Sequence, residues 1–260
     1  MSKHVALVLG SGGARGLAHI GAIEALEERG YTITSIAGCS MGSIIAGMYA
    51  AGQLKEAKEW FLRVDKQLIM RMIDINLLSR NSLVKGQRII EELKTVVPDR
   101  PMEHLLIPCA IIASDMLHTE EVIFRSGSLF DAIRASISIP LFFEPVALGD
   151  RLLIDGGILN PLPLHAVERT EGDILVAADI SGKDHIPVDS KINFVRILDR
   201  MSDMQIQQNT LLSLRLTPPD VHAVMRQYAY NTFDFDKAEE IIAEGKRIMN
   251  EALDAYEKNN

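Results

Sequence analysis

Hydrophobic positions along this chain follow two patterns, one typical of buried strands and one typical of helices that bury a single face. Short apolar or alternating runs predict strands at residues 5–9, 32–39, 105–113, 121–125, 146–148, 151–154 and 173–180. Longer runs with helical spacing predict helices at residues 17–28, 41–51, 54–78, 83–97, 128–136, 192–208 and 236–256. Strands and helices therefore alternate through most of the chain.

The first two strands and the helix between them show what this alternation implies. Leu17, Ile20 and Ile23 share one face of the helix, and glutamates occupy the opposite face. A strand, a helix and a second parallel strand form a right-handed unit, so the loops that follow both strands reach the same edge of one sheet. We therefore expect an α/β fold, a three-layer α/β/α sandwich around a mostly parallel sheet.

Ser40 lies between the second strand and the next helix, at the centre of the sequence Gly38-x-Ser40-x-Gly42. This pattern is typical of a nucleophile elbow, in which a sharp turn exposes a serine hydroxyl to substrate. Glycines fit such a turn because a side chain at either position would collide with the neighbouring strand or helix. The helix N-terminus also directs N–H groups toward a developing oxyanion. For this motif alone, a strand-to-helix turn without chemistry remains an alternative.

A second glycine-rich stretch, Gly10-Ser11-Gly12-Gly13-Ala14-Arg15-Gly16, directly follows the first strand. A dinucleotide site of the G-x-G-x-x-G type would need a third glycine where the chain has Arg15, and a phosphate-binding loop would need a Gly-Lys pair that the stretch lacks. The functional interpretation that remains is a nest of backbone N–H groups, suited to the oxyanion of an acyl intermediate. The structural alternative is a tight turn without a ligand.

The predicted hairpin ends in Asp155-Gly156-Gly157 and is preceded by the apolar stretch 137–145. An aspartate on its own is most often a surface or capping residue. The apolar stretch must be covered, either as a buried connection or as one wall of an apolar substrate channel.

Residues 54–78 are the most amphipathic and locally basic part of the chain, and two of them, Met70 and Met72, are methionines. A helix that docks on the sheet is the simpler interpretation. A lid or a segment that contacts acyl chains is the alternative, because methionine adapts to varied apolar partners.

Composition narrows the function further. The chain has 260 residues without a linker or repeat, 47% of them hydrophobic and 24% charged, so we expect residues 1–260 to form a single domain. The net charge of −8 and the pI near 5.4 argue against a nucleic-acid binder and against broad attraction to anionic membranes. No apolar run approaches the roughly 18 residues that span a bilayer, so any membrane contact is expected to be peripheral.

Cysteine and histidine usage points to a cytoplasmic protein without a metal. Cys39 and Cys109 are the only cysteines, which suggests no disulfide framework and fits a reducing cytoplasm. The first apolar run is too short for a secretory signal and is more simply the first strand. No spacing of His, Asp and Glu resembles a set of metal ligands. We expect no cofactor.

Taken together, the motifs resemble those of the bacterial patatin-like phospholipases, a family of serine acyl hydrolases. The resemblance runs through most of the chain and is carried by the oxyanion loop 10–16, the elbow 38–42, the run 134–140 and the motif 155–157. It implies a catalytic dyad in which Ser40 is the nucleophile and Asp155 the base, without a catalytic histidine. It also assigns Gly10, Gly12, Gly13, Arg15 and Gly16 to the oxyanion loop and Gly156 and Gly157 to the aspartate motif.

A dyad of this kind needs a compensating environment. A carboxylate with an ordinary pKa near 4 is roughly two to three units less basic than imidazole, a deficit of about 3–4 kcal/mol. A partly dry site would raise the basicity of Asp155, and N–H donors from Gly12 and Gly13 would stabilise the transition state by several kcal/mol.

The competing hypothesis is a Ser-Asp-His triad, which requires a histidine after the acid. His165, His185 and His222 satisfy that order, but none lies in a recognisable loop signature. His165 precedes a sequence that predicts the start of a helix. His19 follows the glycine loop and is a candidate for the wall of the site.

We therefore expect a cytosolic serine-dependent lipid acyl hydrolase of the phospholipase A, lysophospholipase or carboxylesterase type, acting on a lipid or acyl ester. One alternative is an acyltransferase or thioesterase that uses the same Ser40. A second is a catalytically silent protein that binds lipid or nucleotide. Reaction with a serine-directed phosphonate separates the last from the other two.

Overall fold

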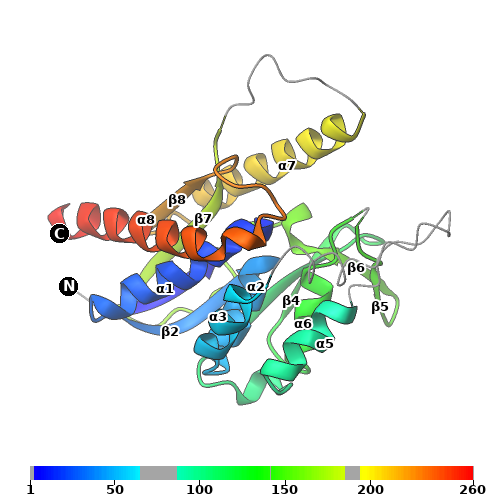
Figure 1. Ribbon diagram of the computed structural model, residues 1–260, viewed down its shortest axis with the longest axis horizontal. Coiled ribbons are helices and arrows are strands. Elements are labelled where there is room, and N and C mark those ends of the chain that lie inside the picture. The colour runs from blue at the N-terminus through cyan, green and yellow to red at the C-terminus, as the bar shows by residue number, and fades with distance from the viewer. Residues whose placement is uncertain (1–2, 65–86, 141, 185–193, 260) are drawn as a thin grey trace.

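The computed structural model describes residues 3–64, 87–140, 142–184 and 194–259. Within these residues the strands form one eight-stranded sheet (Figure 1). Five neighbouring strands run parallel, in the spatial order β3 (Cys109–Asp115), β2 (Thr32–Cys39), β1 (His4–Leu9), β7 (Ile174–Gly182) and β8 (Val221–Arg226). Beyond β3, the sheet is completed by three antiparallel strands, β4 (Glu120–Phe124), β5 (Val146–Leu148) and β6 (Arg151–Asp155). The predicted α/β class with a mostly parallel sheet is confirmed.

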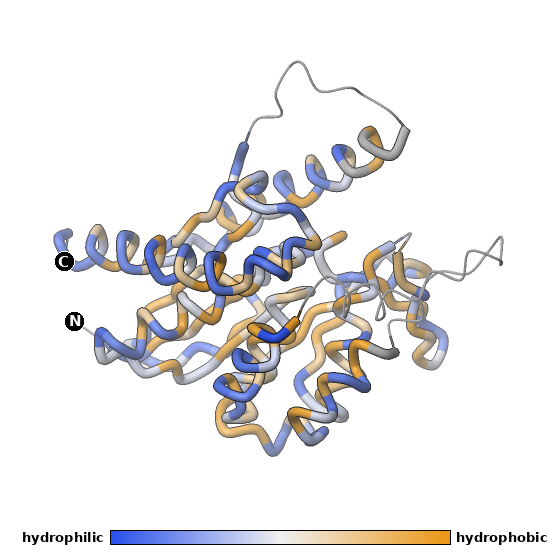
Figure 2. The backbone as a smooth tube through the Cα atoms, viewed as in Figure 1, coloured by the Kyte–Doolittle hydropathy of each residue, from blue (hydrophilic) through white to orange (hydrophobic). Residues whose placement is uncertain are grey.

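Helices flank the sheet, and the core lies on both of its faces. One face is packed by α1 (Ala18–Glu28), α2 (Met41–Ala50), α3 (Leu54–Leu62), α5 (Gln87–Val96), α6 (Leu129–Ser136) and α8 (Ala238–Asn259). The opposite face meets the segment 162–167 and α7 (Phe194–Leu216). Successive residues of β1 alternate between the faces, so Leu7 packs in the first cluster and Val8 in the second. Hydrophobic positions accordingly run through the strands and the inward sides of the helices (Figure 2).

Several predicted elements differ from the structure at their ends. The strand predicted from residue 105 begins only at Cys109, because Pro108 lacks an N–H for the ladder. The helix predicted over 54–78 ends at Leu62, and residues 65–86 lie outside the described residues. Helix α7 continues to Leu216 instead of ending at residue 208. Strand β8 was not predicted, since its six residues alternate between buried and exposed too briefly to stand out.

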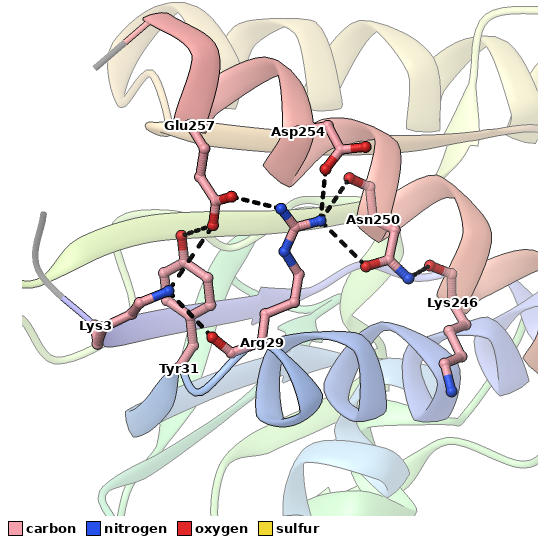
Figure 3. A network of polar contacts seen from close by, with 7 residues as sticks. All are labelled: Lys3, Arg29, Tyr31, Lys246, Asn250, Asp254 and Glu257. Carbon is pink, nitrogen blue, oxygen red and sulfur yellow. Dashed lines mark hydrogen bonds and ion pairs between the residues drawn. The ribbon is translucent and has the colours of Figure 1, made fainter.

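The last helix, α8, is held closely against α1. A Cβ on Gly21 would lie 1.9 Å from the Ile242 carbonyl oxygen, and one on Gly245 would lie 1.9 Å from that of Ala18. At the far end of the contact, Arg29 donates to Asp254 at 2.7 Å and to Glu257 at 2.5 Å (Figure 3). This attachment matters for the site, because the segment 228–235 that leads into α8 lies beside the glycine-rich loop.

Candidate active site

Ser40 forms the apex of a strained turn between β2 and α2. Its backbone φ of 54° and ψ of −123° lie in a region that residues with a side chain rarely adopt. Both backbone groups of Ser40 are held: its N–H donates to Ser136 Oγ at 2.9 Å, and its carbonyl accepts from the Ser43 N–H and hydroxyl at 2.8 and 2.6 Å. The backbone of the turn is therefore held at both polar groups of Ser40.

The two glycines of the elbow are required by close backbone contacts. A Cβ on Gly38 would lie 2.2 Å from the carbonyl oxygen of Gly42. A Cβ on Gly42 would lie 2.3 Å from the carbonyl oxygen of Leu9. The steric role that the sequence predicts for both positions is thus present, and it brings the end of β1 directly against the start of α2.

Asp155 meets Ser40 from the end of β6. The Ser40 hydroxyl donates to Asp155 Oδ2 across 2.6 Å, and the second carboxylate oxygen accepts the N–H of Gly157 at 2.7 Å. The Asp155 N–H in turn donates to the carbonyl of Ser138 at 2.9 Å. Gly156 is needed here, because a Cβ would approach the Ile112 carbonyl oxygen to 2.4 Å. The hairpin that the sequence predicts delivers the carboxylate to the serine.

The environment of Asp155 makes it a stronger base than an exposed carboxylate. Only 5% of the residue is exposed. Burial raises the pKa of Asp155 to about 6, while the hydrogen bonds from Ser40 and Gly157 act in the opposite direction by stabilising the charged form. The group is still ionised at neutral pH, yet its raised pKa recovers much of the basicity that a carboxylate lacks relative to imidazole.

The glycine-rich loop lies beside the elbow and leads through a short helical turn, Gly13–Leu17, into α1. Two backbone N–H groups of the loop already have hydrogen-bond acceptors. That of Ser11 donates to the Pro161 carbonyl and that of Ala14 to the Thr232 carbonyl, each at 2.8 Å. Gly12 and Gly13 precede and begin the helical turn, so their N–H groups have no partner within it. Gly13, at a φ of 57°, lines the same pocket as Ser40.

Gly10, Arg15 and Gly16 of the loop make contacts that hold the loop in place. Gly10 donates its N–H to the carbonyl of Ala178 at 3.0 Å, and a Cβ on Gly16 would lie 2.2 Å from Met41 Cγ. The Arg15 guanidinium is buried and donates from Nε to the Ile180 carbonyl and from Nη1 to the Tyr230 carbonyl, both at 3.0 Å. Arg15 thus ties the loop to β7 and to residues 228–235, and its side chain is not part of the pocket wall beside Ser40.

We call residues 228–235 the C-terminal strap. The sequence analysis missed this segment, whose importance comes from contacts with the glycine-rich loop: Tyr230 accepts from Arg15, and Thr232 accepts from Ala14. Phe233 of the strap packs against Phe142, with ring centroids 5.4 Å apart. The strap is therefore one side of the site.

An apolar pocket opens beside the Ser40 hydroxyl. Its walls come from α2, α3, α5, the stretch after α6 and the C-terminal strap, and they comprise Gly13, Ser40, Met41, Ile44, Trp60, Phe61, Val64, Ile89, Leu93, Ile137, Ile139, Phe143, Thr232, Phe233 and Phe235. The apolar stretch 137–145 thus contributes a wall, one of the two alternatives that its sequence allowed. Part of the segment 54–78 also lines the pocket, and the lid hypothesis for its remainder falls outside the described residues.

The described candidate histidines contact residues other than Ser40 and Asp155. His165 lies in a turn, not at the start of a helix as expected, and its Nε2 is 3.1 Å from Glu121 Oε2. His222 Nε2 is 3.2 Å from Asp179 Oδ2. His19 is fully buried and faces the Gly10 carbonyl, so it does not line the pocket as proposed from the sequence. His185 lies outside the described residues.

The described parts of the chain contain neither a metal-binding cluster nor a membrane-spanning helix. Within those ranges, His, Cys, Asp and Glu side chains form no group of three that could hold a metal ion. Among the helices that the structure describes, none is both long and apolar enough to cross a membrane. Cys39 and Cys109 are both buried free thiols.

Comparisons with known proteins define the class. The model of the patatin-like phospholipase family matches residues 7–167, more than half of the chain. VipD from Legionella pneumophila has a similar fold, with a TM-score of 0.51 over 98% of this chain and 67% of that chain, at 15% identity. The chain belongs to the patatin-like phospholipase family, which confirms the resemblance seen in the motifs.

Two curated relatives each match about 70% of the chain. An NTE family protein of Mycobacterium bovis is 42% identical over 72% of this chain and 51% of its own length. Patatin-like phospholipase domain-containing protein 6 of Mus musculus is 30% identical over 69% of this chain and 14% of its own length. The chain thus spans about half the length of the first of these relatives and a small part of the second.

Proposed function

We propose that this chain is a serine-dependent lipid acyl hydrolase in which Ser40 is the nucleophile and Asp155 the general base. The observation that carries the proposal is the 2.6 Å hydrogen bond from the Ser40 hydroxyl to Asp155 Oδ2 beside an apolar pocket. A nucleophile within hydrogen-bond reach of a base is the arrangement that covalent acyl transfer requires. Membership of the patatin-like phospholipase family supports the same conclusion.

The reaction then follows from the positions of these groups. Asp155 accepts the hydroxyl proton as Ser40 Oγ attacks the acyl carbonyl carbon, and the carbonyl π electrons move onto oxygen. The N–H groups of Gly12 and Gly13 are proposed to bind that oxyanion. When the tetrahedral intermediate collapses, the bond to the leaving oxygen breaks and Asp155 returns the proton to the leaving alkoxide. A water molecule activated by Asp155 then hydrolyses the acyl-enzyme.

The pocket indicates the substrate class. Thr232 and the Ser40 nucleophile are its only hydroxyl side chains among the described lining residues, and most of the others are aliphatic or aromatic. A wall of this kind favours an acyl chain over a polar group, because burying polar atoms without partners is costly. The substrate is therefore proposed to be a lipid or another acyl ester, with its acyl chain in the pocket.

A serine-directed fluorophosphonate tests this function. The proposal expects one equivalent of label on Ser40, together with turnover of a medium-chain p-nitrophenyl ester by the unmodified protein. A folded protein that takes no label would instead be a silent binding protein. Turnover that requires an added alcohol or thiol acceptor would identify an acyltransferase.

A further inference from the structure

His19 is the most deeply buried histidine of the described chain, and one of its two ring nitrogens forms a hydrogen bond. The residue has no exposed surface, and its Nε2 lies 2.8 Å from the carbonyl oxygen of Gly10. A carbonyl oxygen can only accept, so Nε2 carries the proton and donates it. The same tautomer leaves Nδ1 bare, and Nδ1 is buried without a hydrogen-bond partner among the described residues.

A histidine with one unpaired ring nitrogen is energetically unfavourable at a buried position. A buried acceptor without a partner costs about 1–3 kcal/mol, which an apolar side chain of similar size would avoid. Burial lowers the pKa of His19 to about 4, against the opposing effects of the Gly10 hydrogen bond and Asp179. The ring is therefore neutral at physiological pH and remains a donor there. What distinguishes histidine from an apolar residue here is the bond to Gly10.

Gly10 is the first residue of the glycine-rich loop, and the two peptide groups that flank its Cα are each held by a hydrogen bond. Its N–H donates to the carbonyl of Ala178 at 3.0 Å, and its carbonyl accepts from His19. The same carbonyl lies against the elbow, since a Cβ on Gly42 would come within 2.7 Å of it. The His19 bond therefore acts where the loop and the nucleophile elbow touch.

The direction of a peptide group influences the peptides that follow it. Gly12 and Gly13 lie two and three residues beyond Gly10, and glycines have more backbone freedom than other residues. Donors for an oxyanion accelerate a reaction only when they are already aimed at the place where charge develops. A loop of glycines consequently needs fixed anchors at its start.

We propose that His19 is a positioning residue for the oxyanion loop, which it anchors through a neutral Nε2–H bond to the Gly10 carbonyl. This inference rests on the proposed acyl hydrolase function. His19 touches no reacting atom in this account and acts through the Gly10 peptide. It differs from a core histidine with no role in catalysis because its loss affects the transition state more than the bound ground state.

Three variants test the proposal on a soluble p-nitrophenyl ester. His19→Met removes the donor at similar size and should lower kcat about 10- to 100-fold, somewhat less than the removal of an oxyanion donor itself, with KM changed less than about twofold. His19→Gln places an amide N–H near the position of Nε2 and should recover most of the lost kcat. His19→Asn carries the same amide on a shorter chain that does not reach Gly10, so it should resemble the methionine variant.

Wild-type turnover and Ser40 labelling are measured first, and their absence would refute the acyl hydrolase function instead of the role of His19. His165→Gln, a change at a half-exposed histidine, is the control and should retain wild-type kcat. Thermal unfolding shows which variants are folded. If His19→Met does not fold, the comparison of kcat between His19→Gln and His19→Asn tests the proposal. The proposal is wrong if the Gln variant is no better than the Met or Asn variants, if KM alone changes, or if every variant keeps wild-type kcat.

Discussion

The Ser40 hydroxyl donates to Asp155 Oδ2 across 2.6 Å, although the two residues are 115 positions apart in the chain. Two separate structural elements bring these side chains into contact. The elbow lifts Ser40 out of the end of β2, and the β5–β6 hairpin brings Asp155 alongside by pairing β6 antiparallel to β3, the strand next to β2. Both elements depend on glycines, which let two backbone segments approach each other closely.

Replacing Ser40 by alanine should abolish ester hydrolysis, to less than about one part in a thousand, because the reacting oxygen is removed. The fold should survive, since the substitution removes one polar atom and leaves the core volume nearly unchanged. Steady-state hydrolysis and thermal unfolding measure the two effects. Ser35→Ala, at a buried serine earlier on β2, is the matched control and should keep its activity. Residual hydrolysis by Ser40→Ala above about one part in a thousand of the wild-type rate would contradict the role of Ser40 as the nucleophile.

Asp155→Asn should change the pH dependence of stability. The folded-state pKa of Asp155 is about 6 against an ordinary 3.8, so the folded protein binds this proton more tightly than the unfolded chain does. Stability contributed by Asp155 is therefore fully present below pH 4 and is lost as pH rises to about 6. The loss is about 3 kcal/mol at most, at about 1.4 kcal/mol per unit.

Denaturant unfolding of both proteins from pH 4 to pH 8 measures this effect. Relative to wild type, the Asn variant should gain stability as pH rises through that interval and show no further gain above about pH 7. A difference between the two proteins that stays constant over the whole range would contradict a raised folded-state pKa.

Gly13→Ala should lower kcat by about tenfold or more while KM changes little, because the loop acts on the transition state. Gly13 has a φ of 57°, and its Cβ would lie 2.5 Å from Thr232 Cγ2, so the alanine strains the loop and displaces the strap. Gly30→Ala is the matched control, because Gly30 also has a positive φ, of 75°, but would meet no atom within 4 Å. An effect confined to KM would assign Gly13 to substrate binding.

Phe233→Ala should alter the preference for acyl-chain length. Phe233 lines the pocket and packs against Phe142, so the aromatic pair connects the stretch after α6 to the C-terminal strap. Removing the ring enlarges the pocket and should shift the optimum of kcat/KM toward longer p-nitrophenyl esters. Leu106→Ala, at a side chain that is 72% exposed and outside the pocket wall, serves as control. A uniform loss for all chain lengths would indicate damage to the fold instead of a change in selectivity.

The parts of the site that could be predicted from the sequence are those encoded by local patterns. The elbow and the glycine-rich loop each directly follow a parallel strand, and the topology of a parallel sheet brings the loops after neighbouring strands together. The Asp155 motif follows β6, which is antiparallel to β3, and the role of Asp155 is expected only from the resemblance to the family. The alternation of apolar runs likewise predicted β1, β2, β7 and the helices that cover them. Short-range sequence signals were sufficient for these strands and helices and for the position of the two loops.

The features that were missed depend on contacts between distant segments. Nothing in the local sequence shows that Tyr230 and Thr232 reach the glycine-rich loop, because their position is set by β8 and by the attachment of α8 to α1. The direction of the Arg15 side chain follows from the same contacts. The position of His19 one helical turn after the loop predicts a side chain on the wall of the site, whereas its ring is directed to the Gly10 carbonyl.

The rate at which a neutral fluorophosphonate labels Ser40, measured from pH 4 to pH 9, tests the Ser40–Asp155 dyad most directly, because it requires no lipid and isolates activation of the nucleophile. The dyad predicts that the wild-type rate constant rises with pH through an inflection near the Asp155 pKa of about 6 and then levels off. Asp155→Asn should react at least about 100-fold more slowly and lack that inflection, while His165→Ala, His185→Ala and His222→Ala retain both. Wild-type labelling by Asp155→Asn, together with loss of labelling in one histidine variant, would contradict the dyad.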